Sequence, residues 1–133
     1  MTYLLDTHIF LWALFEPDRL AGKVTNILLD HNNTVRVSAI TFFEISLKFS
    51  LGKLELQNIK PEELIEAAEK TGFEIFPIDV TDIATFYNLP NIGHKDPFDR
   101  LLIWQCIRNN MIMITRDSRF KEYENSGLRY ITM

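Results

Sequence analysis

The sequence predicts an α/β fold, with a central parallel sheet of about five strands between two layers of helices. Five short and mostly apolar runs are the candidate strands, at residues 3–5, 35–37, 73–78, 111–114 and 128–131. Segments of helical character separate these runs, as expected where crossover helices join parallel strands. The chain has 133 residues, of which 47% are hydrophobic and 24% are charged, so we expect one globular domain over residues 1–133.

Apolar spacing and the residues that begin and end helices place the predicted helices. One apolar stripe has the spacing i, i+4, i+7 and i+8 of an amphipathic helix, at Leu20, Val24, Ile27 and Leu28. Gly52 is positioned to end one helix, and Pro61 and Pro97 to begin two others. The predicted helices cover residues 7–15, 20–28, 41–51, 61–70, 81–89 and 97–109, and a short helical turn follows Asp117.

Cysteine content and hydropathy indicate where the protein resides. Cys106 is the single cysteine, so no internal disulfide can form, and a reducing, cytoplasmic location is expected. No apolar run approaches the ~20 residues that a membrane-spanning helix needs. The first residues also lack the basic and apolar segments of a signal peptide, so we expect no association with a membrane.

Four acidic residues fall where predicted strands end or predicted helices begin. Asp6 and Asp117 follow strands, and Glu44 and Asp99 lie in first helical turns. Ligand sites of parallel sheets form at this edge. Four carboxylates gathered there would repel one another, and Mg²⁺ or Mn²⁺, which prefer oxygen ligands, would compensate. The absence of histidine and cysteine from this set argues against zinc.

Helix capping is the alternative explanation for each acid. Residues Thr41 to Glu44 match the capping box S/T-x-x-E. Asp96 is placed as an N-cap, with Pro97 at the first helical position and Asp99 at the third. Asp6 and Asp117 would also serve as caps. Capping alone does not explain why several elements carry acids at one sheet edge, so the combination favours a metal site.

The net charge of −4 is low for a protein that binds nucleic acid. Without the four proposed site carboxylates, however, acidic and basic residues balance at 14 each. Several basic residues gather late in the chain and predict a local basic rim beside the acids. They are Lys95, Arg100, Arg108, Arg116, Arg119 and Lys121.

Four segments together resemble the PIN-domain proteins, and more narrowly the VapC-type toxins of type II toxin–antitoxin systems. The segments are Leu4-Leu5-Asp6-Thr7-His8, Thr41-Phe42-Phe43-Glu44, His94-Lys95-Asp96-Pro97-Phe98-Asp99-Arg100-Leu101-Leu102 and Thr115-Arg116-Asp117. The third segment is the most specific. The resemblance implies a PIN-like three-layer α/β/α domain, Mg²⁺ or Mn²⁺ binding, endoribonuclease activity, homodimers and inhibition by a small antitoxin.

By position, the family's four acids correspond to Asp6, Glu44, Asp99 and Asp117. Asp96 competes with Asp99 for the third place, and its capping position makes Asp99 the preferred ligand. The predicted reaction is hydrolysis of an RNA phosphodiester by a metal-activated water, with Asp6 as the central ligand.

Three neighbours of these acids are candidates for supporting roles. The hydroxyls of Thr7 and Thr115 would orient ligands or water, or would simply begin helices. Arg116 would contact a substrate phosphate, or would be a solvated surface charge.

Other functions remain open from the sequence alone. A nuclease acting on DNA would use the same metal chemistry, and a catalytically silent binding module would keep the fold. A phosphatase of the haloacid-dehalogenase type is disfavoured, because that pattern requires a second aspartate where this chain has His8.

Overall fold

The computed structural model describes residues 1–93 and 96–133, and it confirms the predicted fold class. Five parallel strands form one sheet in the order β3-β2-β1-β4-β5. The strands are β1 (Thr2–Leu5), β2 (Thr34–Ser38), β3 (Glu74–Phe76), β4 (Ile112–Thr115) and β5 (Arg129–Thr132). β1 is central, and Leu4 is in register with Arg36 of β2 on one side and Met113 of β4 on the other.

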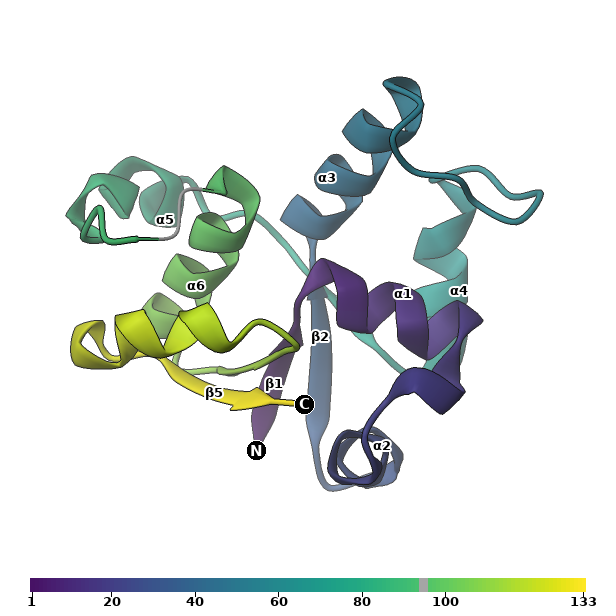
Figure 1. Ribbon diagram of the computed structural model, residues 1–133, viewed down its shortest axis with the longest axis horizontal. Helices are drawn as coiled ribbons and strands as arrows, with labels where there is room; N and C mark the ends of the chain where they lie inside the picture. Colours follow the sequence, from purple (N-terminus) through teal and green to yellow (C-terminus); the bar gives the residue numbers. More distant parts are fainter. Residues whose placement is uncertain (94–95) are drawn as a thin grey trace.

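Helices cover both faces of this sheet (Figure 1). The α-helices are α1 (Thr7–Phe15), α2 (Gly22–Leu29), α3 (Ala39–Ser50), α4 (Glu63–Thr71), α5 (Val80–Thr85) and α6 (Pro97–Asn109). Short 3-10 helices are η1 (Pro17–Arg19), η2 (Phe86–Asn88) and η3 (Ser118–Ser126). No helix of the described residues is long and apolar enough to cross a membrane.

Two predicted elements differ from the structure, and a proline follows each of them. The strand predicted over 73–78 is limited to β3, because Pro77 has no N–H to donate to a neighbouring strand. The helix predicted over 81–89 divides into α5 and η2. Pro90 follows this segment, and the residue before a proline is disfavoured in the helical conformation.

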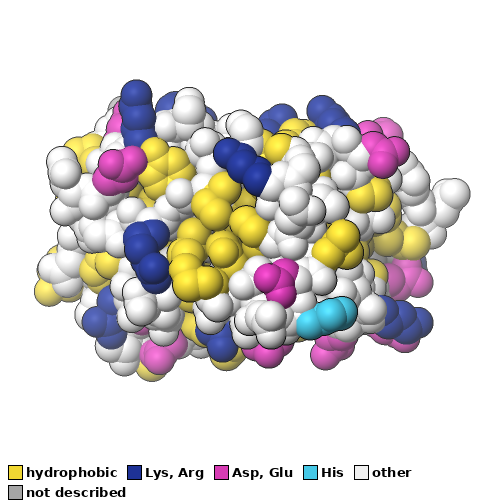
Figure 2. All heavy atoms as spheres, turned by 90° about the horizontal axis from the view of Figure 1, so that it is seen from below, with side chains coloured by type: hydrophobic (Ala, Val, Ile, Leu, Met, Phe, Trp, Pro, Cys, Tyr) yellow, Lys and Arg dark blue, Asp and Glu magenta, His cyan; other side chains and the backbone are white. Residues whose placement is uncertain are grey.

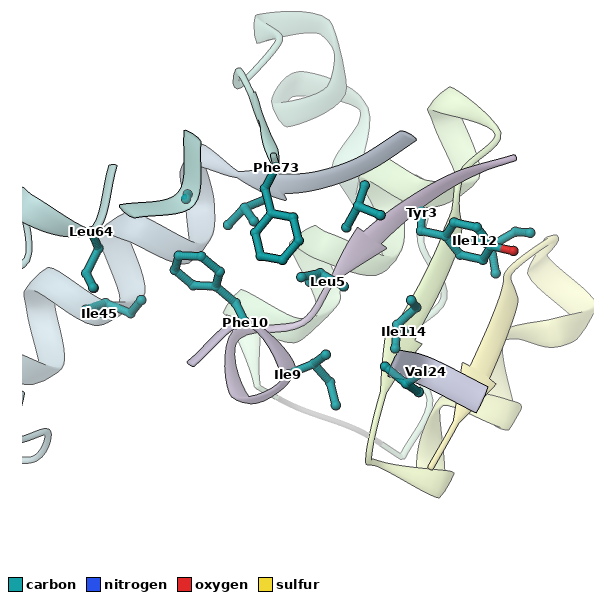
Figure 3. Close-up of a cluster of buried hydrophobic side chains, with 13 residues drawn as sticks. Tyr3, Leu5, Ile9, Phe10, Val24, Ile45, Leu64, Phe73, Ile112 and Ile114 are labelled. Atoms are coloured by element: carbon teal, nitrogen blue, oxygen red, sulfur yellow. The ribbon is translucent and has the colours of Figure 1, made fainter. Parts of the chain in front are cut away.

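The side chains of β1 alternate between two hydrophobic cores. Tyr3 and Leu5 face the core formed with α1, α2 and α4, which is shown in Figure 3. Leu4 faces the second core, formed mainly with α6 and η3. Leu4 and Leu5 are both fully buried, so each contributes roughly 2 kcal/mol of hydrophobic stabilisation. The strand that leads to Asp6 is therefore fixed from both faces.

Buried polar contacts fix α6, which carries Asp99. Ser38 at the end of β2 donates a hydrogen bond to the side-chain oxygen of Gln105, at 2.6 Å. The buried carboxylate of Asp82 in α5 accepts hydrogen bonds from Arg108 and Asn109, at 3.1 and 2.9 Å. These contacts anchor the middle and the end of α6 to neighbouring elements.

Candidate metal centre

The carboxyl ends of β1, β2 and β4 meet at one edge of the sheet, where β1 leads into α1 and β2 into α3 (Figure 1). Three aspartates at this edge cap helices. Asp6 accepts a hydrogen bond from the N–H of Ile9 at 2.8 Å, Asp96 from that of Phe98 at 2.8 Å, and Asp117 from that of Arg119 at 2.9 Å. The capping explanation is thus correct for these three residues.

Capping does not remove these carboxylates from the surface of a common pocket. An open pocket of about 750 Å³ is lined by Asp6, Asp96, Asp99 and Asp117. His8, Arg116 and Arg119 also line it. Of the four predicted ligands, Asp6, Asp99 and Asp117 thus line one pocket together with Asp96, whereas Glu44 is not among its lining residues.

Asp6 lies in an environment that disfavours its charged form. Burial raises the pKa of Asp6 to about 6, and the negative charge of Asp99 adds to the increase. Hydrogen bonds from Thr115 and from the N–H of Ile9 act in the opposite direction. Ionising a buried carboxyl group beside a second carboxylate costs free energy, and a bound cation would offset that cost.

Glu44 is the exception to the capping explanation. The predicted helix start at Thr41 is wrong by two residues, because Ser38 caps α3 by accepting a hydrogen bond from the N–H of Ile40. Glu44 therefore lies in the second turn of α3 and caps nothing. Its carboxylate is buried, and it accepts hydrogen bonds from Thr7 at 2.6 Å and from the ammonium of Lys48 at 2.5 Å.

The two threonines proposed to support the acids both contact them. Thr7 donates to Glu44, as described, and Thr115 donates to Asp6 at 2.5 Å. The oxygen of Thr115 also accepts a hydrogen bond from the N–H of Asp117 at 3.0 Å. Thr115 thus links two of the acids through one hydroxyl group.

Only some of the basic residues predicted to form a rim lie at the pocket. Arg119 binds Asp117 through two nitrogens, with its Nη2 at 2.7 Å from Oδ2. Arg116 lies over the ring of Trp12, 5.1 Å from its centroid. Arg108 instead pairs with Asp82, and Arg100 donates to the carbonyls of Leu89 and Pro90. His94 and Lys95, in the predicted motif and rim, lie outside the described residues.

His8 lies at the rim of the same pocket. Partial burial lowers the pKa of His8, and the neighbouring positive charge of Arg116 lowers it further. Both effects favour the neutral imidazole.

The donor chemistry of the pocket fits a hard divalent cation, because all of its acidic side chains offer carboxylate oxygens. Within residues 1–93 and 96–133, no three acidic, histidine or cysteine side chains are grouped closely enough to form a ready metal site. Lys48 holds Glu44 and Arg119 holds Asp117. A cation that used either carboxylate would take the place of these contacts.

The ion pairs of Lys48 with Glu44 and of Arg119 with Asp117 were not predicted from the sequence. Lys48 stands four residues after Glu44, the spacing at which oppositely charged side chains meet on a helix. That spacing is the signal available for Lys48. From the sequence, Arg119 is expected only as part of a basic rim. Its ion pair with Asp117 forms in the turn at the start of η3.

Comparison with known proteins gives concordant results. The PIN-domain family model matches residues 3–125. Ribonuclease VapC22 of Mycobacterium tuberculosis is 27% identical over 124 residues, which is 93% of each chain. The solved structure of VapBC2 from Rickettsia felis, bound to a promoter DNA fragment, aligns with a TM-score of 0.70 at 20% identity, over 100% of this chain and 99% of that one. VapBC-1 from nontypeable Haemophilus influenzae aligns with a TM-score of 0.65 at 21% identity, over 99% and 98%. At such identities the two structures show likeness of fold.

Proposed function

The chain belongs to the PIN-domain family, and from this premise we propose that it is a metal-dependent endoribonuclease and the toxin of a type II toxin–antitoxin pair. The observation that carries the proposal is the pocket that buried Asp6 lines together with Asp99 and Asp117. The relative named Ribonuclease VapC22 and the fold shared with VapBC proteins support it. We propose that the enzyme acts in the cytoplasm as a single domain.

We assign different roles to the residues at and near this pocket. Asp6 would be the central ligand for Mg²⁺ or Mn²⁺ together with Asp99 and Asp117, and Glu44, which does not line the pocket, would complete the acidic set. Thr115 and Thr7 orient the carboxylates of Asp6 and Glu44 through the hydrogen bonds described above. When bound, the cation would supply Lewis acidity for hydrolysis of the phosphodiester.

Arg116 and Asp96 serve the pocket from its edge. Arg116 is exposed at the rim, so its guanidinium can bind a backbone phosphate of the RNA and position the strand. Asp96 fixes the start of α6 by accepting hydrogen bonds from the N–H groups of Phe98 and Asp99, at 2.8 and 3.2 Å. It thereby fixes the backbone that carries Asp99.

A cleavage assay with matched substrates tests the proposal. End-labelled single-stranded RNA and DNA of one sequence are incubated with the protein in Mg²⁺, in Mn²⁺ and in EDTA. We expect internal cleavage of RNA with either cation and none in EDTA or with Asp6→Asn. Cleavage of DNA alone would support a DNA nuclease instead, and manganese binding without cleavage of either strand would support a catalytically silent module.

We expect a partner protein to inhibit the enzyme by placing an arginine or lysine in the acidic pocket. The guanidinium of Arg119 already binds Asp117 there through two nitrogens. A guanidinium from outside would compete with the metal ion for the same carboxylates, so excess Mn²⁺ should weaken inhibition. The measurement is binding and inhibition by the protein encoded next to this gene, with and without Mn²⁺. Inhibition that survives replacement of every basic residue in its C-terminal arm would contradict the prediction.

We also expect a homodimer with a hydrophobic interface. α3 exposes Phe43, Leu47 and Phe49, whereas Phe10 of α1 is fully buried and contributes nothing to such a surface. A further hydrophobic patch, flanked by lysine and arginine, lies on the face seen in Figure 2. Light scattering should report twice the monomer mass at micromolar concentration, and Phe43→Glu should shift the mass toward the monomer if α3 forms the interface. A monomeric wild-type protein would refute this expectation.

A further inference from the structure

Lys48 pairs with Glu44 on α3, and neither side chain is among those that line the acidic pocket. Its ammonium lies 2.5 Å from Oε2 of Glu44, one helical turn earlier on α3. The same ammonium interacts electrostatically with Asp96 and Asp99, which line the pocket. Three acids from two helices therefore act on one cationic side chain.

This ion pair differs from an ordinary pair on a helix surface. The side chain of Glu44 is 4% exposed and that of Lys48 is 37% exposed. Lys70 and Glu66 on α4 have the same sequence spacing, but their side chains are 76% and 74% exposed. The Lys70–Glu66 pair gains little stability in water, whereas Lys48 neutralises a carboxylate that is shielded from water. The two pairs thus provide a matched comparison within one chain.

Both oxygens of Glu44 have partners, with Oε1 bound to Thr7 and Oε2 to Lys48. If Glu44 ligates a divalent cation, as in the proposed function, the cation and the ammonium compete for Oε2. An ammonium released from Oε2 would remain within electrostatic range of Asp96 and Asp99, since it is tethered to α3. A phosphate oxygen of bound RNA would then be a suitable new partner for the ammonium, because it is an anionic acceptor like the carboxylate of Glu44.

We propose that Lys48 is an exchangeable counter-cation: it holds Glu44 until the divalent cation binds, and then binds a phosphate of the RNA next to the scissile bond. This proposal rests on the proposed function. It predicts opposite effects of one substitution on two measurable properties, because Lys48 competes with the metal ion but assists the RNA.

The test compares Lys48→Met and Lys48→Arg with the wild type. Calorimetric titration with Mn²⁺ alone should show affinity about 5-fold to 10-fold higher for Lys48→Met, since the competitor is gone. Lys48→Arg should bind Mn²⁺ more weakly than the wild type, because a guanidinium can hold a carboxylate with two hydrogen bonds. Lys70→Met is the control and should leave Mn²⁺ affinity unchanged.

The second measurement is RNA cleavage at saturating Mn²⁺. Lys48→Met should reduce kcat/KM by about 10-fold to 100-fold, and Lys48→Arg should reduce it less. The dependence of log KM on log salt concentration should become less steep by about 0.7, as expected for the loss of one phosphate contact with a single strand. Lys70→Met should change neither kcat/KM nor the salt dependence.

Each other outcome overturns a defined part of the proposal. Unchanged Mn²⁺ affinity in Lys48→Met would exclude competition for Glu44. Lower affinity together with lower unfolding temperature would show that Lys48 only supports the fold. Higher affinity with unchanged cleavage would refute the phosphate contact. If the wild type cleaves no RNA, the proposed function fails, while the order of Mn²⁺ affinities still decides whether Lys48 and the cation exchange.

Discussion

Replacement of Asp6 by asparagine should abolish RNA cleavage and, in EDTA, make the protein more stable at neutral pH. The pKa of Asp6 is raised from 3.8 to about 6 by burial, with a further contribution from the charge of Asp99. Ionised Asp6 therefore costs folding free energy. A shift of this size corresponds to about 3 kcal/mol once the group is fully ionised.

The sign of the pH dependence follows from the raised pKa in the folded state. Between about pH 4 and pH 6, folded Asp6 keeps its proton while unfolded Asp6 loses it, so wild-type stability falls as the pH rises from about 4 and levels off above about 6. The asparagine side chain of the variant does not titrate and would show no such transition. The advantage of Asp6→Asn should therefore be near zero below about pH 4 and reach about 2 to 3 kcal/mol above about pH 7.

Urea unfolding in EDTA across this pH range measures the effect, and Asp79→Asn provides the control. Asp79 also caps a helix, by accepting a hydrogen bond from the N–H of Thr81 at 2.7 Å, but it is exposed. Asparagine caps a helix about as well as aspartate, so this control should change stability little at any pH. An Asp6→Asn variant that is less stable than the wild type in EDTA at the alkaline end of the range would refute the electrostatic cost assigned to Asp6.

Substitutions of Asp99 and Asp96 by asparagine should differ strongly in their effect on RNA cleavage. Asp99→Asn should reduce cleavage by at least about 100-fold, because Asp99 is the aspartate that acts electrostatically on Asp6 and is proposed to share its cation. Asp96→Asn should retain cleavage within about 10-fold, since asparagine preserves the cap of α6. Kinetic assays at saturating Mn²⁺ measure both variants.

A third variant tests the capping role of Asp96 directly. Asp96→Ala removes the acceptor for the N–H groups of Phe98 and Asp99, so it should lower the free energy of unfolding by about 1 kcal/mol. Asp96→Asn should keep most of that stability. If instead Asp96→Asn abolishes cleavage and Asp99→Asn does not, the assignment of the third acid has to be exchanged.

The sheet and the position of most acids can be predicted because both follow from local patterns. A short buried run followed by an aspartate indicates a strand that ends at the sheet edge, and this pattern places Asp6 and Asp117. The position of Asp96 before Pro97 likewise identifies it as an N-cap. The sequence pattern therefore locates the edge of the sheet where the pocket lies.

The rest could not be predicted, because it depends on contacts between distant segments. Glu44 has the position that ends a capping box, but Ser38 competes more successfully for the helix start. Its actual partner Thr7 is 37 residues away in sequence. The partners of Lys48 and Arg119 are, by contrast, only four and two residues away in the sequence, and for Lys48 the helical spacing was an available signal.

The order of strands in the sheet has a consequence for the time at which the protein becomes active. β1 is synthesised long before β4, yet β4 is one of its two neighbours, with Tyr3 paired to Ile112. Asp96, Asp99 and Asp117 are also made well after Asp6. A growing chain on the ribosome therefore has one side of the central strand unpaired and lacks most of the acidic pocket until the residues through Asp117 have emerged. The proposed nuclease cannot form before that point, so the ribosome and messenger RNA that produce it are not exposed to it earlier.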